Sequence, residues 1–144
     1  MSTCCESKVR RGHGYCYGVA GNGRECDLAL TWPLAVWDGH DPWEWLVSLV
    51  IPDMQQRMRD AGLLDPELEV LWGVGGRLFI SDSAGAVVGP RRSYAAIGCG
   101  SAWAEGALHA TGRLRPRTRL KHALEAAAAH SVHVAPPWRM LRVG

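Results

Sequence analysis

The sequence predicts an α+β fold in which helices pack against antiparallel β-sheets. Short apolar runs suited to strands follow one another in the middle of the chain, separated by glycine-containing turns. Longer stretches with helical apolar spacing stand in blocks before and after these runs. A strict alternation of single strands and helices would favour a parallel sheet, so this segregated order favours antiparallel strands with helices layered outside them.

One domain, residues 13–144, is expected to follow a flexible N-terminal segment, residues 1–12. The N-terminal segment is polar, and a chain of 144 residues suffices for one well-packed core. Residues 15–20 (YCYGVA) predict a buried strand that ends at glycines. A short helix over residues 24–30 is then expected to stop before Pro33.

A longer helix is predicted to begin at Pro42. Asp41 is a favoured N-cap residue, and proline is favoured at the first helical position. Apolar residues recur at helical spacing after them, and Gly62 ends the pattern. Pro52 lies inside this helix and is expected to kink or divide it, because proline lacks the amide hydrogen and collides with the preceding turn.

The central part of the chain predicts a β-hairpin and further strands. Residues 68–74 and 77–81 flank Gly75-Gly76, a dipeptide suited to the positive φ angles of tight hairpin turns. The later apolar runs expected to extend the sheets are residues 86–88 and 94–97.

Two helices and a last strand are expected to complete the chain. The first helix covers residues 101–110, with Ser101 as a plausible cap. The second covers residues 117–132, which are rich in alanine. Two adjacent prolines then break the chain before a short terminal strand over residues 138–143.

Composition narrows the classes of function. Hydrophobic residues make up 47% of the chain and charged residues 21%, as in ordinary globular proteins. The net charge of +2 is too small to favour a nucleic acid as partner, and no apolar run approaches the ~20 residues of a membrane span. The 6 histidines form no zinc-type pattern, so no metal is expected, and no cofactor either. An odd cysteine count of 5 and the lack of a secretory signal favour reduced thiols and a cytoplasmic location.

The turn over residues 98–101 is the first candidate site. A strand that turns through Gly-x-Gly-Ser into a helix leaves backbone N–H groups pointing at one spot, and glycine lets helix and sheet approach closely. Cys99 lies in this turn, where the helix N-terminus favours a thiolate, and is a candidate nucleophile. His109 and His130 are its candidate bases. The alternative is a small buried residue in a tight turn.

Three blocks of the sequence match a known pattern. The first runs from Gly73 to Leu108 and combines the hairpin with the motif Y-x-A-(apolar)-G-x-G-x-x-x-A-x-G-A-L. The second links Lys8-Val9-Arg10-Arg11 to Y-G-V-A-G, and the third covers the last helix and strand. Together they resemble the proteasome β-subunit family of N-terminal-nucleophile hydrolases, most closely the small bacterial and phage-borne proteasome-like peptidases.

This resemblance implies a four-layer αββα sandwich of antiparallel sheets and a threonine-type peptidase chemistry. In the family an N-terminal threonine attacks the peptide bond, and its own α-amine is the general base. Lys8 matches the lysine that lowers the pKa of the nucleophile, and the backbone N–H of Gly18 matches an oxyanion donor. Cys16 and Ala20 match residues that line the pocket for the substrate side chain.

The attacking threonine is missing from the position that the resemblance requires. In full-length relatives it opens a strand well before the matching lysine, whereas only seven residues precede Lys8 here. The supporting serine and aspartate of the family are replaced by Cys99 and His130. We therefore expect an N-terminally truncated or degenerate member, with a sandwich incomplete at its N-terminal edge and no activity in this form. Ser2, exposed by removal of the initiator methionine, is an alternative nucleophile.

Three functions stay open at this level. The chain is a proteasome-type peptidase by descent, acting on peptides or unfolded proteins, whose true start with a threonine lies upstream. Alternatively, it is a non-catalytic structural subunit that associates with itself or with paralogous subunits in a proteasome-like ring. The third reading is a cysteine-dependent hydrolase that uses Cys99. Missing edge strands would leave an open sheet edge, so an oligomer is expected.

Overall fold

The computed structural model describes residues 8–134, 136 and 138–143. Its strands form one antiparallel sheet with the order β1-β2-β3-β4-β5, so the predicted α+β class with antiparallel strands is confirmed. The strands are β1 (Val9–Arg11), β2 (Tyr15–Ala20), β3 (Glu69–Val74), β4 (Arg77–Ser81) and β5 (Val87–Val88). The helical elements are α1 (Gly23–Ala29), α2 (Pro42–Trp45), η1 (Leu46–Val50), α3 (Ile51–Asp60), α4 (Ser101–Ala110) and α5 (Pro116–His130).

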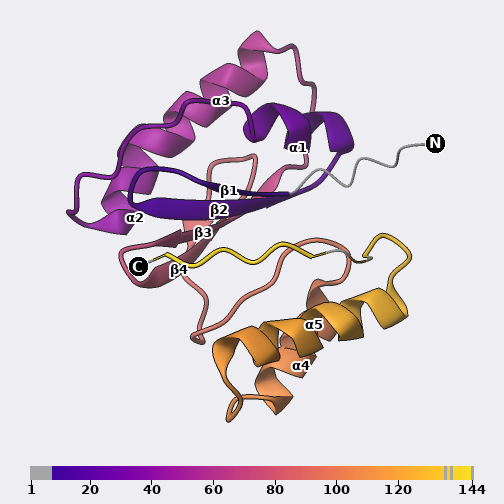
Figure 1. Cartoon of the computed structure of the whole chain (residues 1–144). Coiled ribbons are helices and arrows are strands. Elements are labelled where there is room, and N and C mark those ends of the chain that lie inside the picture. The colour runs from indigo at the N-terminus through magenta and orange to yellow at the C-terminus, as the bar shows by residue number, and fades with distance from the viewer. Residues whose placement is uncertain (1–7, 135, 137, 144) are drawn as a thin grey trace.

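The sheet separates two groups of helices, as Figure 1 shows. α1, α2 and α3 cover one face, and α4 and α5 form a hairpin on the other side. In the view of Figure 1 the C-terminal segment crosses between the sheet and this hairpin. Every strand in the described residues belongs to the one sheet, and extended chain lies where the four-layer arrangement expects a second sheet. None of the described helices is both long and apolar enough to cross a bilayer.

Two predicted strands are absent from this sheet. Residues 94–97 and residues 138–143 are not assigned to any strand. A strand needs a neighbour in register to take up its backbone N–H and C=O groups, and an apolar run alone does not provide one. The prediction of strands at these two places was therefore wrong.

A strand also occurs where the sequence predicted a flexible segment. β1 lies within residues 1–12 and pairs with β2, with Arg10 opposite Tyr17. The Arg10 guanidinium donates to the carbonyls of Leu30 and Trp32, which ties β1 to the chain after α1. These long-range hydrogen bonds hold a polar segment in the sheet, so residues 9–11 depart from the predicted flexible tail.

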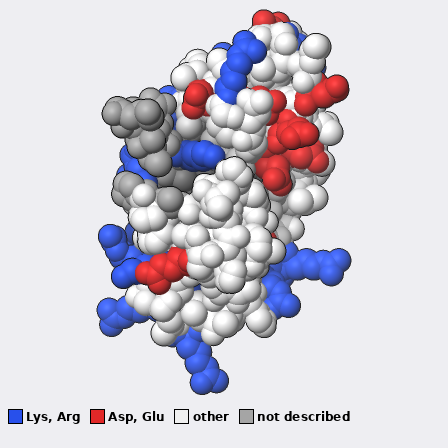
Figure 2. Space-filling model, turned by 90° about the vertical axis from the view of Figure 1, so that its right-hand side faces the viewer, with Lys and Arg blue, Asp and Glu red and all other residues white. Residues whose placement is uncertain are grey.

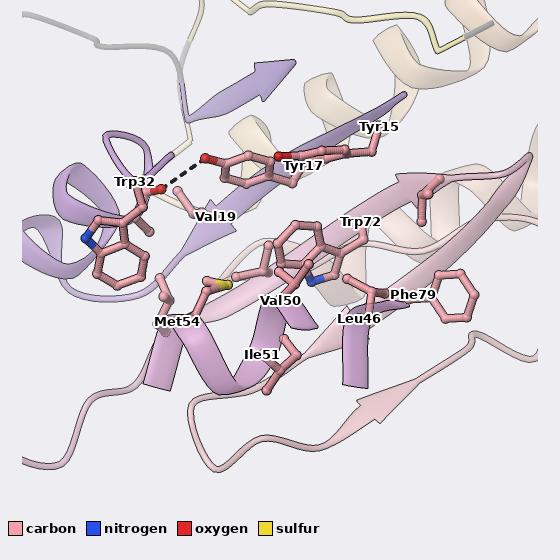
Figure 3. Packing of buried hydrophobic residues seen from close by; sticks show 14 of the residues in the cluster. Tyr15, Tyr17, Val19, Trp32, Leu46, Val50, Ile51, Met54, Trp72 and Phe79 are labelled. Carbon is pink, nitrogen blue, oxygen red and sulfur yellow. Dashed lines mark hydrogen bonds between the residues drawn. The ribbon is translucent and has the colours of Figure 1, made fainter. Parts of the chain in front are cut away.

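The hydrophobic core lies between the sheet and α1 to α3, as Figure 3 shows. Alternate residues of β2 and β3 point into it, which is the two-residue period of a strand with one buried face. Trp72 lies at the centre of this core and is 0% exposed. The Trp72 indole N–H donates to the Ser81 hydroxyl at 2.9 Å. The rings of Tyr17 and Trp45 lie 5.1 and 6.5 Å from the Trp72 ring, the latter edge-on.

The helix predicted from Pro42 is divided by a π-helical turn rather than by a break. Asp41 caps it as expected, accepting from the Glu44 N–H at 3.0 Å. The Ile51 N–H then donates to the Leu46 carbonyl, five residues back. Pro52 comes directly after this turn. A wider turn relieves the collision between the proline ring and the preceding carbonyls, so the helix continues through Pro52 as α3.

Candidate functional site

Three separated parts of the chain meet at the end of β2. The Val19 N–H donates to the Lys8 carbonyl at 2.9 Å, which fixes the start of β1 beside this end. The turn after residue 97 packs on the face of β2 that points away from the main core, because a Cβ placed on Gly98 would lie 3.3 Å from the Ala20 Cβ. The Lys8 backbone, Ala20 and the Gly-x-Gly turn therefore meet at this end of β2.

Lys8 is exposed, and its charge acts on the thiol of Cys26 in α1. Burial raises the pKa of Cys26, and the Lys8 charge opposes this effect without cancelling it. The Cys26 residue is 3% exposed, so Cys26 is a buried, protonated thiol at neutral pH. This neighbour is not an activated nucleophile, and the predicted role of Lys8 stays a prediction.

Gly18 lies in the middle of β2, opposite Val9 on one side and Leu71 on the other. The N–H and C=O of a strand residue point to the same side, and successive residues alternate. Because the Val19 N–H points to β1, the Gly18 N–H points to β3 and faces Leu71. To bind an oxyanion, Gly18 would have to leave this ladder, and its predicted role stays a prediction.

Gly21, directly after β2, is a better placed backbone donor that the motif reading overlooked. Its φ angle is +140°, and a Cβ there would lie 3.0 Å from the Glu67 carbonyl oxygen, so only glycine fits. Among the described residues, none accepts a hydrogen bond from its N–H. The sequence signal that could have identified Gly21 as a donor is its position directly before Asn22, which caps α1.

Cys16 and Ala20 share one face of β2, the face away from the main core. They are four residues apart, which is about 13 Å along a strand. Ala20 lies at the Gly98 turn, whereas Cys16 packs its sulfur beside Gly73 and near Arg11. Burial raises the pKa of the Cys16 thiol, and the Arg11 charge opposes this. A pocket lined by both residues would have to extend along the strand, and this role stays a prediction.

Cys99 is exposed in the turn before α4, and its sulfur lies 3.4 Å from the Ser131 hydroxyl oxygen. Gly98 has a φ angle of +89°. A Cβ on Gly100 would lie 3.0 Å from the Ala127 Cβ, so this glycine lets the turn pack against α5. Gly100, not the predicted Ser101, is the N-cap residue of α4.

The two histidines proposed as bases for Cys99 have other partners. His109 Nδ1 lies 2.9 Å from the Tyr94 hydroxyl and 3.1 Å from an Arg92 guanidinium nitrogen. The His130 ring stacks on Trp103, with ring centres 5.6 Å apart. Neither imidazole forms a hydrogen bond to the Cys99 sulfur. The turn therefore presents a thiol with a hydroxyl neighbour, and in the described residues no group of three metal-binding side chains comes together.

Comparison with known proteins identifies the fold. No protein-family model and no curated protein matches the sequence. Among solved structures, HslV from Trypanosoma brucei is 18% identical and has a TM-score of 0.64, covering 90% of this chain and 76% of HslV. BPH from Thiobacillus denitrificans is 19% identical with a TM-score of 0.66, covering 91% of this chain and 75% of BPH. BPH in complex with epoxomicin is 18% identical and gives a TM-score of 0.68 over the same shares.

This chain has the fold of HslV and BPH. The predicted N-terminal-nucleophile-hydrolase type of α+β fold is confirmed by these structures. The agreement extends over nine-tenths of this chain.

Proposed function

We propose that this chain is a member of the proteasome-type N-terminal-nucleophile hydrolases. The observation that carries the proposal is that the Lys8 backbone and the Gly98 turn both contact the end of β2, within a fold shared with HslV and BPH. Lys8 supplies a positive charge that acts on Cys26 in α1, and Gly21 supplies a backbone N–H beside the α1 N-terminus. These are two of the groups that acyl transfer requires, namely a helper cation and an oxyanion donor.

The 144-residue chain is further proposed to lack peptidase activity. Catalysis of this type needs a nucleophile with a base at hydrogen-bond distance. The thiol that feels the Lys8 charge, Cys26, is buried and protonated. Cys99 has a hydroxyl rather than a base as its neighbour. Ser2, the other predicted nucleophile, lies outside the described residues.

We expect no hydrolysis of fluorogenic peptides by this chain above the rate of the buffer. We also expect no covalent adduct in the intact mass after incubation with epoxomicin, the compound bound to BPH. An active proteasome-type peptidase is the positive control. Turnover that falls by about 100-fold or more in Lys8→Ala would contradict the proposed inactivity and establish a working site at Lys8. Turnover unchanged in Lys8→Ala would remove this site from the proposal.

A structural role follows if the chain is inactive. We propose that it associates with further copies or with paralogous subunits, so that its contribution is assembly rather than cleavage. Cys16, Cys26 and Cys99 are all free thiols. Free thiols are usual in a reducing compartment, so we place the chain in the cytoplasm. Sedimentation velocity of the purified chain tests the self-association.

Exposure of Cys99 favours the cysteine hydrolase as the second candidate. We expect iodoacetamide at neutral pH to modify Cys99 in the folded protein and to modify Cys26 only after unfolding, since Cys26 is buried and its pKa is raised. Peptide mapping by mass spectrometry separates the two sites. Labelling alone does not establish catalysis, so Cys99→Ser must be assayed beside the unmodified chain. An ester or amide hydrolysis lost in Cys99→Ser would favour the cysteine hydrolase, and an unchanged rate would exclude it.

A further inference from the structure

The charges of the chain are divided between its two halves. Residues 1–88 hold 7 Lys and Arg against 12 Asp and Glu, whereas residues 89–144 hold 9 against 2. The net charge of +2 is therefore the sum of −5 and +7. Figure 2 shows acidic side chains gathered on the upper part of one face and basic side chains around the lower part, where α4 and α5 lie.

The positive charge is concentrated at the connection between α4 and α5. Arg113 and Arg115 in this connection and Arg117 in the first turn of α5 are exposed, and we call residues 113–117 the basic tip. Leu114 lies between two of these arginines and is 44% exposed. Within the described part of the chain, none of the three arginines forms an ion pair. The basic tip thus combines unneutralised charge with an apolar side chain.

An opposite surface lies in the connection between α3 and β3. Asp60 at the end of α3 and Asp65 and Glu67 in the connection are exposed, and we call residues 60–67 the acidic loop. Leu64 lies among them and is 90% exposed. No lysine or arginine in the described residues forms an ion pair with these carboxylates, and Arg24 reaches only the Ala61 carbonyl, at 3.4 Å. The acidic loop has the opposite charge to the basic tip and, like the tip, carries an exposed leucine.

The two surfaces are unable to satisfy each other within one chain, because the helices that carry them lie on opposite sides of the sheet (Figure 1). We infer that the basic tip of one copy docks on the acidic loop of a second copy. This rests on the self-association in the proposed function and names the surfaces that form it. Each leucine would enter the apolar centre of the contact, with opposite charges at its rim. Because the two surfaces differ, the contact is head-to-tail and builds closed rings or open filaments.

A nucleic acid is the other polyanion that a basic tip fits, but the observations favour a protein copy. A nucleic-acid ligand needs no acidic loop of matching size on the same chain, and it gives no role to the exposed leucines. The acidic loop also has no partner of its own if the tip binds nucleic acid.

The test is sedimentation velocity of the full chain at about 50 mM and about 500 mM NaCl, since salt shortens the Debye length and screens exposed charges. We expect oligomers in low salt and monomers in high salt. Arg113→Glu/Arg117→Glu and Asp60→Lys/Glu67→Lys should each weaken association about 10-fold or more in low salt. Mixing the two variants should restore it, because their reversed surfaces are complementary. Asp38→Lys/Glu44→Lys reverses as many exposed charges outside both surfaces and should leave association unchanged.

Each negative result of these experiments would overturn a different part of the proposal. Oligomers that persist in high salt and in both double variants would keep the self-association but overturn these surfaces. A monomer under all conditions would overturn both the self-association and the two docking surfaces. Membership of the proteasome-type hydrolases is tested separately, by the peptidase assay. A monomer that binds a single-stranded oligonucleotide, and loses it in Arg113→Glu/Arg117→Glu, would overturn the docking in favour of nucleic acid. The docking would also be overturned if the mixture of the two double variants failed to associate.

Discussion

Replacing Trp72 by alanine should lower the free energy of unfolding by about 3–5 kcal/mol, the range for removal of a large buried aromatic side chain. Trp72 is fully buried and contacts the rings of Tyr15, Tyr17 and Trp45. The substitution leaves a cavity between sheet and helices, and it also removes the donor to the buried Ser81 hydroxyl. Urea denaturation followed by far-UV circular dichroism measures the change.

Two further variants make this result interpretable even if Trp72→Ala fails to fold. Trp72→Phe keeps most of the ring but loses the hydrogen bond to Ser81, so a smaller loss of about 1–3 kcal/mol is expected. Trp103→Ala removes an indole that is 42% exposed and stacks on His130, and should change stability by less than about 1 kcal/mol. Equal losses in Trp72→Phe and Trp103→Ala would contradict the central role of Trp72.

Gly75→Ala should destabilise the chain by about 2–4 kcal/mol, more than the same change at Gly76. The two glycines form the β3–β4 turn with φ angles of +59° and +71°, so alanine is strained at both. A Cβ on Gly75 would also lie 2.7 Å from Pro42 Cγ and 3.2 Å from two Trp37 ring atoms, whereas a Cβ on Gly76 meets nothing within 4 Å. The urea midpoints of the two variants measure the difference.

Gly76→Ala is a matched control, because it changes the same turn in the same way without the collision. Its expected loss is about 1–2 kcal/mol, the cost of alanine in a left-handed conformation. Similar losses at both positions would show that the turn moves away from α2 at little cost. The packing of the hairpin on Pro42 would then contribute little to stability.

Most elements on the buried side of the sheet could be predicted from local sequence. β2 and β4 have the predicted bounds, since each combines an apolar run with a turn signal at its end. The Gly75-Gly76 turn is confirmed by its positive φ angles. The strands predicted over residues 94–97 and 138–143 were wrong, because local sequence does not say whether a paired neighbour is available.

The candidate site was predictable as a place but not as an arrangement of atoms. The motifs pointed separately to Lys8, the β2 end and the Gly98 turn, and in the structure the Lys8 backbone and the Gly98 turn both contact the end of β2. The side to which the Gly18 N–H points depends on the register with β1, and no motif encodes it. The partners of His109 are Tyr94, in a segment that was misread as a strand, and Arg92, just before that segment.

The π-helical turn before Pro52 decides which side chains face inward. In an uninterrupted α-helix, the stripe that buries Trp45 and Leu46 would continue through Leu49. The wider turn accommodates one more residue, so that Val50 faces the sheet while Leu49 is left 54% exposed. The same π-helical turn thus lets the helix accept a proline and determines which of its residues face the sheet. A chain without Pro52 could also lack one residue of this turn, and the buried residues before and after the turn would still lie on one face of the helix.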